Sequence, residues 1–199
     1  MIHKKRNIIF DLDETLYMDN SLRQRREQAI LAFLGDKSKK YLELRKNGGT
    51  IASLKELGIS KELFYSIIEK VEINLNPDEK LRKIIEKLKN NFKIIVLSNV
   101  SKNLVKKTLE KIGIIDLIDD YYGADCFSQQ KPCIECFSMV RKGDICIGNN
   151  YEKDLEVPGS IGAITLLIGK NDKRPDFCAE SIYDTPSIIS QIESVLYPK

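Results

Sequence analysis

Short apolar runs that alternate with helical segments constrain the fold of this chain more than any other feature. Four such runs, at residues 7–10, 92–97, 144–148 and 162–168, are rich in branched apolar residues and are each followed by Gly, Ser, Asn or Asp. A shorter run at 121–124 is a further candidate strand. Strands separated by helices favour a parallel sheet covered by helices on both faces. We therefore predict an α/β fold with a doubly wound, Rossmann-like parallel sheet.

Helix signals fall between these runs. Pro77, Asp78 and Glu79 suit the first turn of a helix that runs to about residue 90, because proline and acidic side chains are favoured there. Periodicity and breakers predict further helices at residues 102–112, 132–141 and 186–196.

A block of helical periodicity without a β-rich run occupies residues 18–75. Within it, Leu63, Ile67 and Val71 share one predicted helix face, and Ile30, Phe33 and Leu34 share another. We predict two domains: a core made of residues 1–17 and 76–199, and a compact helical domain inserted after the first strand.

Bulk properties exclude several classes of protein. The 199 residues carry 32 basic and 29 acidic side chains, and a net charge of +3 does not indicate a nucleic-acid partner. No apolar run reaches the ~20 residues that span a bilayer or resembles the core of a secretory signal. We expect a cytoplasmic protein without a membrane partner, and the sequence leaves its oligomeric state open.

The 5 cysteines form no obvious disulfide framework, because their number is odd and the expected compartment is reducing. Cys133 and Cys136 have the spacing of half a zinc or redox site, but no second pair and no nearby histidine completes it. The alternative is two reduced cysteines on one helical turn. His3 is the sole histidine, so a Ser-His or Cys-His mechanism has little to work with.

Polar residues follow the predicted strands, and the carboxyl ends of parallel strands are where such sheets bind ligands. Lys131 lies in the connection that follows the third strand. The residues at the other strand ends are Asp11 and Asp13, Ser98 and Asn99, and Asn149, Asn150 and Asp154.

This set of side chains is suited to phosphoryl transfer. A carboxylate can attack phosphorus, and a second acid close by can protonate the leaving oxygen. Magnesium prefers oxygen ligands and offsets the repulsion between a carboxylate and a phosphate. A hydroxyl group and a lysine can stabilise further charge on the transferring group.

The segment Asp11-Leu12-Asp13-Glu14-Thr15-Leu16-Tyr17 resembles the first motif of the haloacid dehalogenase (HAD) superfamily. Three later segments match that superfamily in order: Ser98-Asn99, Lys131-Pro132 and Gly148-Asn149-Asn150-Tyr151-Glu152-Lys153-Asp154. The resemblance covers essentially the whole chain. It implies a Mg²⁺-dependent hydrolase whose helical insertion is a mobile cap.

The resemblance also implies roles for individual residues. Asp11 would be the nucleophile and a metal ligand, and Asp13 the general acid and base, with its backbone carbonyl on the metal. Lys131 would neutralise the charge of the nucleophile and the phosphate. The phosphoryl group would be bound by Ser98, by the backbone of Asn99 and by Lys131, and the metal by Asp11, Asp13, Asn149 and Asp154.

One residue departs from the family pattern. Asn149 stands where the fourth motif usually has an aspartate. An amide oxygen can bind Mg²⁺ but brings no charge, so we expect weaker metal binding, partly compensated by Asp154. The alternative is a protein that binds a phosphorylated ligand or a protein partner without efficient turnover.

Among the reactions of the superfamily, we expect phosphatase activity on a small phosphomonoester. Asp13 argues against a dehalogenase, which needs no general acid there, and nothing indicates the protected phosphoenzyme of a mutase. Residues 41–54 resemble the cap of the pyrimidine 5′-nucleotidase-like branch, which implies a nucleotide; sugar phosphates and phosphoglycolate-like acids are the alternatives. Candidate substrate contacts are Tyr17, Asp19, Asn20, Arg23, Arg45 and residues 47–50.

Overall fold

The computed structural model describes residues 5–47 and 49–196, so His3 and Gly48 lie outside the described residues. The chain divides into two compact units. The sheet unit comprises Met1–Met18 and Leu75–Lys199, and the helical unit comprises Asp19–Asn74. Each unit has buried apolar side chains of its own.

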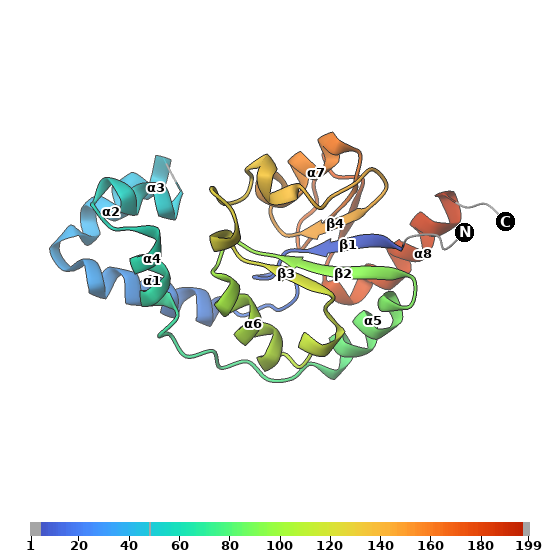
Figure 1. Ribbon diagram of the computed structural model, residues 1–199, viewed down its shortest axis with the longest axis horizontal. Helices are drawn as coiled ribbons and strands as arrows, with labels where there is room; N and C mark the ends of the chain where they lie inside the picture. Colours follow the sequence, from blue (N-terminus) through green and yellow to red (C-terminus); the bar gives the residue numbers. More distant parts are fainter. Residues whose placement is uncertain (1–4, 48, 197–199) are drawn as a thin grey trace. The chain divides into compact units, whose positions relative to one another are not determined.

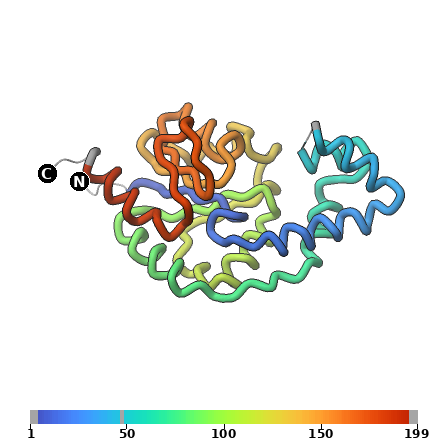
Figure 2. Tube along the Cα trace, turned by 180° about the vertical axis from the view of Figure 1, so that it is seen from behind, coloured from blue at the N-terminus to red at the C-terminus, as the bar shows by residue number. Residues whose placement is uncertain are grey.

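The sheet unit contains a six-stranded sheet in the order β3-β2-β1-β4-β5-β6, and every neighbouring pair is parallel (Figure 1). Its strands are β1 (Arg6–Phe10), β2 (Phe92–Leu97), β3 (Asp120–Tyr122), β4 (Ile145–Gly148), β5 (Ile164–Ile168) and β6 (Phe177–Ala179). Figure 2 shows β1, in blue, between the green and orange parts of the chain that contribute β2 and β4. The predicted α/β fold with a parallel sheet is confirmed.

Helices cover both faces of this sheet, because successive strand residues point to opposite sides and both sides are apolar. Ile8 and Phe10 pack in one core with α5 (Glu79–Lys89), α6 (Lys102–Lys111) and α8 (Thr185–Leu196). Ile9 packs in a second core with Leu155 and Phe137. The helix α7 (Glu156–Ile161) lies on this second side, opposite α5 and α6 (Figure 1).

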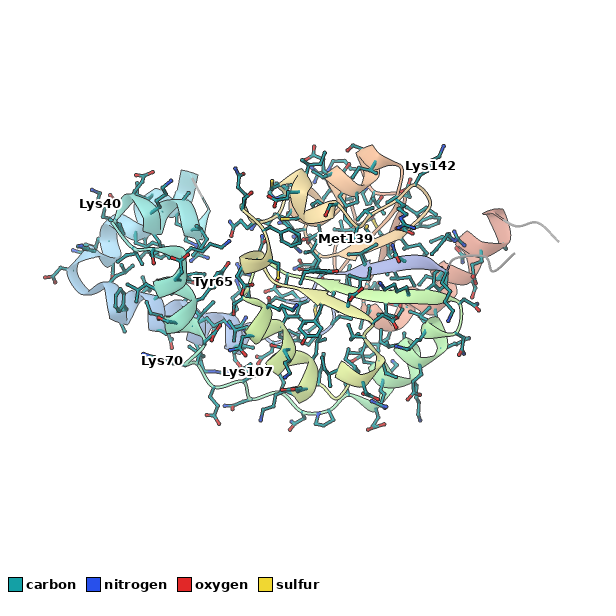
Figure 3. The ribbon with its side chains drawn as sticks, viewed as in Figure 1. Lys40, Tyr65, Lys70, Lys107, Met139 and Lys142 are labelled. Carbon is teal, nitrogen blue, oxygen red and sulfur yellow. The ribbon has the colours of Figure 1, made fainter. Side chains whose placement is uncertain are left out.

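Side chains at the helix ends explain where the helices begin and stop. Asp78 caps α5, since its Oδ1 accepts a hydrogen bond from Leu81 N at 2.8 Å. Ser101 caps α6 in the same way through Leu104 N at 3.3 Å. The segment after α6 turns at Gly113, whose φ of 78° favours glycine. Lys107 on α6 is exposed, whereas Met139 belongs to the opposite layer (Figure 3).

The prediction of a helix at 132–141 is wrong, because the structure has only the 3₁₀ turn η4 (Ile134–Phe137) there. The segment forms successive tight turns instead, with Cys133 N bonded to Gln130 O and Cys136 N to Cys133 O, each at 3.0 Å. These turns place Cys136 and Phe137 in the second core. Burial of those side chains decides the backbone conformation over the local helix signals.

The remaining short turns are η1 (Gly35–Lys37), η2 (Ile115–Leu117), η3 (Ala124–Cys126), the π turn η5 (Tyr151–Leu155) and η6 (Ile182–Asp184). None of the described helices is both long enough and apolar enough to cross a membrane.

The helical unit consists of α1 (Asn20–Leu34), α2 (Ser38–Asn47), α3 (Thr50–Glu56) and α4 (Lys61–Ile68). The predicted core face of α4 is wrong: Leu63 is 39% exposed, while Phe64, Tyr65 and Ile68 are buried. On α1, Ile30 and Leu34 are buried as predicted, but Phe33 is exposed. Tyr65 is labelled on α4 in Figure 3. The spacing of four residues that joins 63 to 67 also joins 64 to 68, so periodicity alone selects neither face.

Candidate active site

Asp11 stands at the carboxyl end of β1, and its side chain is only 10% exposed. Its backbone N–H donates to Ile147 O at 2.8 Å, which ties the start of the loop to β4. Its Oδ1 accepts a hydrogen bond from Lys131 Nζ at 2.7 Å, and its Oδ2 accepts one from Thr15 Oγ1 at 3.2 Å. The carboxylate is therefore held in one orientation.

The ammonium group of Lys131 links the ends of β1 and β2 to the π turn η5. It donates to Asp11 Oδ1 and to Asp154 Oδ1, each at 2.7 Å, and to Leu97 O at 2.9 Å. These three acceptors use all the donors of an ammonium group, and the side chain is only 3% exposed. The structure thus brings Asp11, Lys131 and Asp154 together from three separate segments.

Asn99 positions Lys131. Its Oδ1 accepts from Lys131 N at 2.8 Å, and its Nδ2 donates to Lys131 O at 3.1 Å. The peptide bond between Lys131 and Pro132 is cis. The sequence indicated only the Asn99 backbone as a phosphate ligand, so this use of its side chain was missed.

Burial perturbs both members of the Asp11–Lys131 pair. Removal from water raises the pKa of Asp11 to about 7, an effect that the Lys131 ammonium opposes and the Asp154 carboxylate strengthens. Burial by itself lowers the pKa of Lys131, but the two carboxylates outweigh it and hold that pKa above its usual range. Lys131 therefore remains a cation.

Asp13 lies two residues after Asp11 and meets Ser98 at the end of β2. Its Oδ2 accepts a hydrogen bond from Ser98 Oγ at 3.4 Å, and its Oδ1 accepts one from Tyr17 O–H. Ser98 is buried, and its N–H donates to Tyr122 O of β3 at 3.0 Å. Tyr17, considered from sequence as a substrate contact, is thus a partner of Asp13.

Asp154 lies in the π turn η5 and faces the end of β4. Its Oδ2 accepts from Asn150 N at 3.1 Å, and its Oδ1 is the one bonded to Lys131. A Cβ on Gly148 would come within 2.5 Å of the Asp154 Cβ, so only glycine admits this approach.

Asn149 contacts a residue that sequence reasoning did not select. Its Nδ2 donates to Glu14 Oε2 at 3.0 Å. Glu14 lies between Asp13 and Thr15 and has a φ of 60°. Only its place inside the first acidic loop could have drawn attention to it.

The donors near Asp11 suit a hard cation, although the described residues contain no group of three His, Cys, Asp or Glu side chains able to hold a metal. The candidate metal ligands besides the Asp11 carboxylate are the Asp13 carbonyl and the Asn149 amide, which also offer oxygen atoms. Such a set fits Mg²⁺ better than a softer metal. All five cysteines are free, and Cys133 and Cys136 lie on one 3₁₀ turn.

The sequence of residues 8–144 matches the family model of haloacid dehalogenase-like hydrolases. That match spans more than half of the 199 residues, and the chain belongs to this family. A comparison with curated protein sequences finds no significant match.

Solved structures of similar fold carry several activities in their names. β-Phosphoglucomutase from Clostridium difficile has a TM-score of 0.70 at 19% identity, over 97% of this chain and 99% of that one. A predicted phosphoglycolate phosphatase from Haemophilus somnus 129pt has a TM-score of 0.65 at 18% identity, over 95% and 100%. A magnesium-bound HAD-hydrolase from Bacillus subtilis has a TM-score of 0.64 at 15% identity, over 94% and 99%. 2-Haloacid dehalogenases also occur among the similar structures. At such identities, the likeness shows the fold alone.

Proposed function

We propose that this chain is a Mg²⁺-dependent phosphatase that hydrolyses a small phosphomonoester through an aspartyl phosphate on Asp11. The observation that carries the proposal is the pairing of Asp11 with Lys131 at 2.7 Å. A second carboxylate, that of Asp13, follows two residues later and contacts Ser98. A nucleophilic carboxylate, a fixed cation and a nearby acid are the groups that phosphoryl transfer requires.

The proposed reaction has two steps. An Asp11 oxygen attacks phosphorus, the bond from phosphorus to the ester oxygen breaks, and Asp13, acting as the general acid, gives a proton to the leaving alcohol. Asp13 then takes a proton from water, whose oxygen attacks the aspartyl phosphate and releases inorganic phosphate and the Asp11 carboxylate. Hydrogen bonds from Tyr17 and Ser98 orient Asp13 for both steps.

Asp11, the Asp13 backbone carbonyl and the Asn149 amide oxygen would hold the Mg²⁺ ion. When bound, magnesium supplies positive charge that offsets the repulsion between the carboxylate and the phosphate. We propose that Asp154 acts mainly through Lys131, since its oxygens accept from Lys131 Nζ and Asn150 N. Ser98 and the Asn99 backbone would bind the phosphoryl oxygens.

We propose the helical unit as a cap that contributes substrate contacts. Its candidate residues include Asp19, which caps α1 through Ser21 N at 2.8 Å, and Arg45, which pairs with Glu27. Because both side chains have structural partners, neither of them identifies the substrate. We therefore propose only its class: a nucleotide, a sugar phosphate or a phosphoglycolate-like acid.

The test is hydrolysis of p-nitrophenyl phosphate by the wild type, Asp11→Asn and the exposed control Asp116→Asn, each with and without Mg²⁺. We expect Mg²⁺-dependent turnover in the wild type and the control. Asp11→Asn removes the nucleophile and should lose roughly a thousandfold or more in turnover. Chloride release from a 2-chloro acid in place of phosphate release would assign the chain to dehalogenases.

Asn149 favours one alternative, a protein that binds a phosphorylated ligand or a protein partner with little turnover. In that case the wild type is inactive toward phosphomonoesters, while Asn149→Asp gains Mg²⁺-dependent activity. Equal activity of both proteins would count against the alternative.

A further inference from the structure

Glu14 is the acidic residue of the first loop to which the proposed reaction gives no role. Its Oε2 accepts a hydrogen bond from Asn149 Nδ2 at 3.0 Å, across 135 positions of sequence. Asn149 is also the residue at which this chain departs from the family pattern. The two side chains that need an explanation therefore contact each other.

The backbone of Glu14 is not the one that a glutamate prefers. Among residues 5–47 and 49–196, it is the only one other than glycine with a positive φ. This conformation brings a Cβ close to the neighbouring carbonyl, so glycine or asparagine is favoured there. Unfavourable backbone geometry of this kind concentrates at functional sites, where a side chain contributes something that glycine cannot.

The hydrogen bond selects one orientation of the Asn149 amide. The Glu14 oxygen is the acceptor in this contact, so the Asn149 amide nitrogen faces Glu14. The amide oxygen, which is the atom able to bind a metal, is then turned away from Glu14. Without this partner the amide could present either its nitrogen or its oxygen.

Glu14 also places a carboxylate next to position 149, where the negative charge of an aspartate is missing. Asn149 is neutral where an aspartate would be negative, and the Glu14 carboxylate lies one hydrogen bond behind it. Groups behind a metal ligand commonly orient it and tune its affinity, and their loss costs tenfold to a hundredfold in metal binding.

We infer that Glu14 is a positioning residue for the proposed magnesium site. Glu14 turns the Asn149 oxygen toward the ion and supplies the negative charge that Asn149 lacks. The inference rests on the proposed function in taking Asn149 as a magnesium ligand. It adds a Glu14–Asn149 pair that takes the place of the single aspartate.

The test is calorimetric titration of the metal-free protein with Mg²⁺ alone, for the wild type, Glu14→Gln, Asn149→Asp and the double variant. Glu14→Gln should raise the dissociation constant of Mg²⁺ about tenfold or more. The negative charge is lost, and the Asn149 amide is no longer held in one orientation. The double variant should bind at least as tightly as the wild type. Its new glutamine amide can donate to its new aspartate carboxylate, so the pair regains both its hydrogen bond and its charge. Glu86→Gln, on the exposed face of α5, is the matched control and should bind as the wild type does.

Glu14→Gly separates this role from a purely structural one. Glycine accepts the positive φ, so the melting temperature of the metal-free variant should stay the same or rise while Mg²⁺ binding weakens. Wild-type affinity in Glu14→Gln would overturn the inference, as would a double variant that binds as weakly as Glu14→Gln.

Turnover and binding fail separately in this design. If Mg²⁺ binding depends on Glu14 but p-nitrophenyl phosphate is not hydrolysed, the inference stands and the proposed phosphatase is wrong. If hydrolysis requires Mg²⁺ and Glu14→Gln leaves Mg²⁺ binding unchanged, the phosphatase stands and the inference is wrong.

Discussion

The Asn99 side chain holds the backbone of Lys131 at both of its polar groups, accepting from the N–H at 2.8 Å and donating to the C=O at 3.1 Å. Asn99 directly follows Ser98, at the carboxyl end of β2. The same short segment therefore positions the hydroxyl that contacts Asp13 and the lysine that contacts Asp11.

Asn99→Ala removes both of these hydrogen bonds. We expect a loss of about 1–3 kcal/mol in the free energy of unfolding, because partly buried backbone groups are left without partners. Urea unfolding measures this loss, and the exposed Asn91→Ala should change stability by less than about 0.5 kcal/mol. Equal stabilities of the two variants would show that the Asn99 amide does not hold Lys131.

Lys131→Met removes the cation between two buried carboxylates. We expect the variant to lose about 3–5 kcal/mol of stability without metal, because Asp11 and Asp154 are left buried without a counter-charge. The exposed Lys153→Met serves as the control in the same urea titration. A loss below about 1 kcal/mol would mean that water or another group neutralises the pair.

The stability of the same Lys131→Met variant should fall as the pH rises. Burial holds the pKa of Asp11 above its usual 3.8, and removal of Lys131 takes away the influence that lowers it. A carboxyl with a higher pKa in the folded state stabilises the fold below its unfolded pKa, and this contribution is lost as pH rises through the folded value. Metal-free Lys131→Met should therefore be more stable at pH 5 than at pH 8, and the reverse order would contradict the assignment.

Gly148→Ala tests the close approach of Asp154 to β4. The new Cβ would lie 2.5 Å from the Asp154 Cβ, so we expect both lower stability and lower activity. Gly159→Ala is the matched control: its Cβ would meet nothing closer than 3.4 Å, and α7 should tolerate it. Thermal unfolding of the two variants should separate them by several degrees.

The cysteines should differ in reactivity according to their exposure. Cys126 is exposed, whereas Cys136 and Cys146 are buried, and burial raises the pKa of the Cys146 thiol well above its usual range. Iodoacetamide labelling followed by peptide mass spectrometry should modify Cys126 first and the two buried thiols only on unfolding. Rapid labelling of Cys146 in the native protein would contradict its burial in the second core.

The amino-acid sequence by itself determined the class of fold and which polar residues follow each of the main strands. Apolar runs such as residues 92–97 predict strands because both faces of a parallel strand are buried. Caps such as Asp78 act within one turn of helix, so their effect can be read locally. The first three motifs lie within the residues that match the family model, and they can be recognised for the same reason, since each lies in one short segment.

Only the tertiary structure decided which of two possible faces of α4 is buried, and that residues 132–141 form turns. It also added β6, a three-residue strand whose pairing with β5 leaves no periodic signal in so short a segment. These features depend on which neighbouring surface is available for burial.

The contacts that complete the candidate site also come from the tertiary structure alone. Asn99 meets Lys131 across 32 positions, and Glu14 meets Asn149 across 135. The physical reason is that a hydrogen bond needs its partners within about 3 Å. The register of the sheet and the packing of its two cores set such distances, and no local pattern in the sequence encodes them.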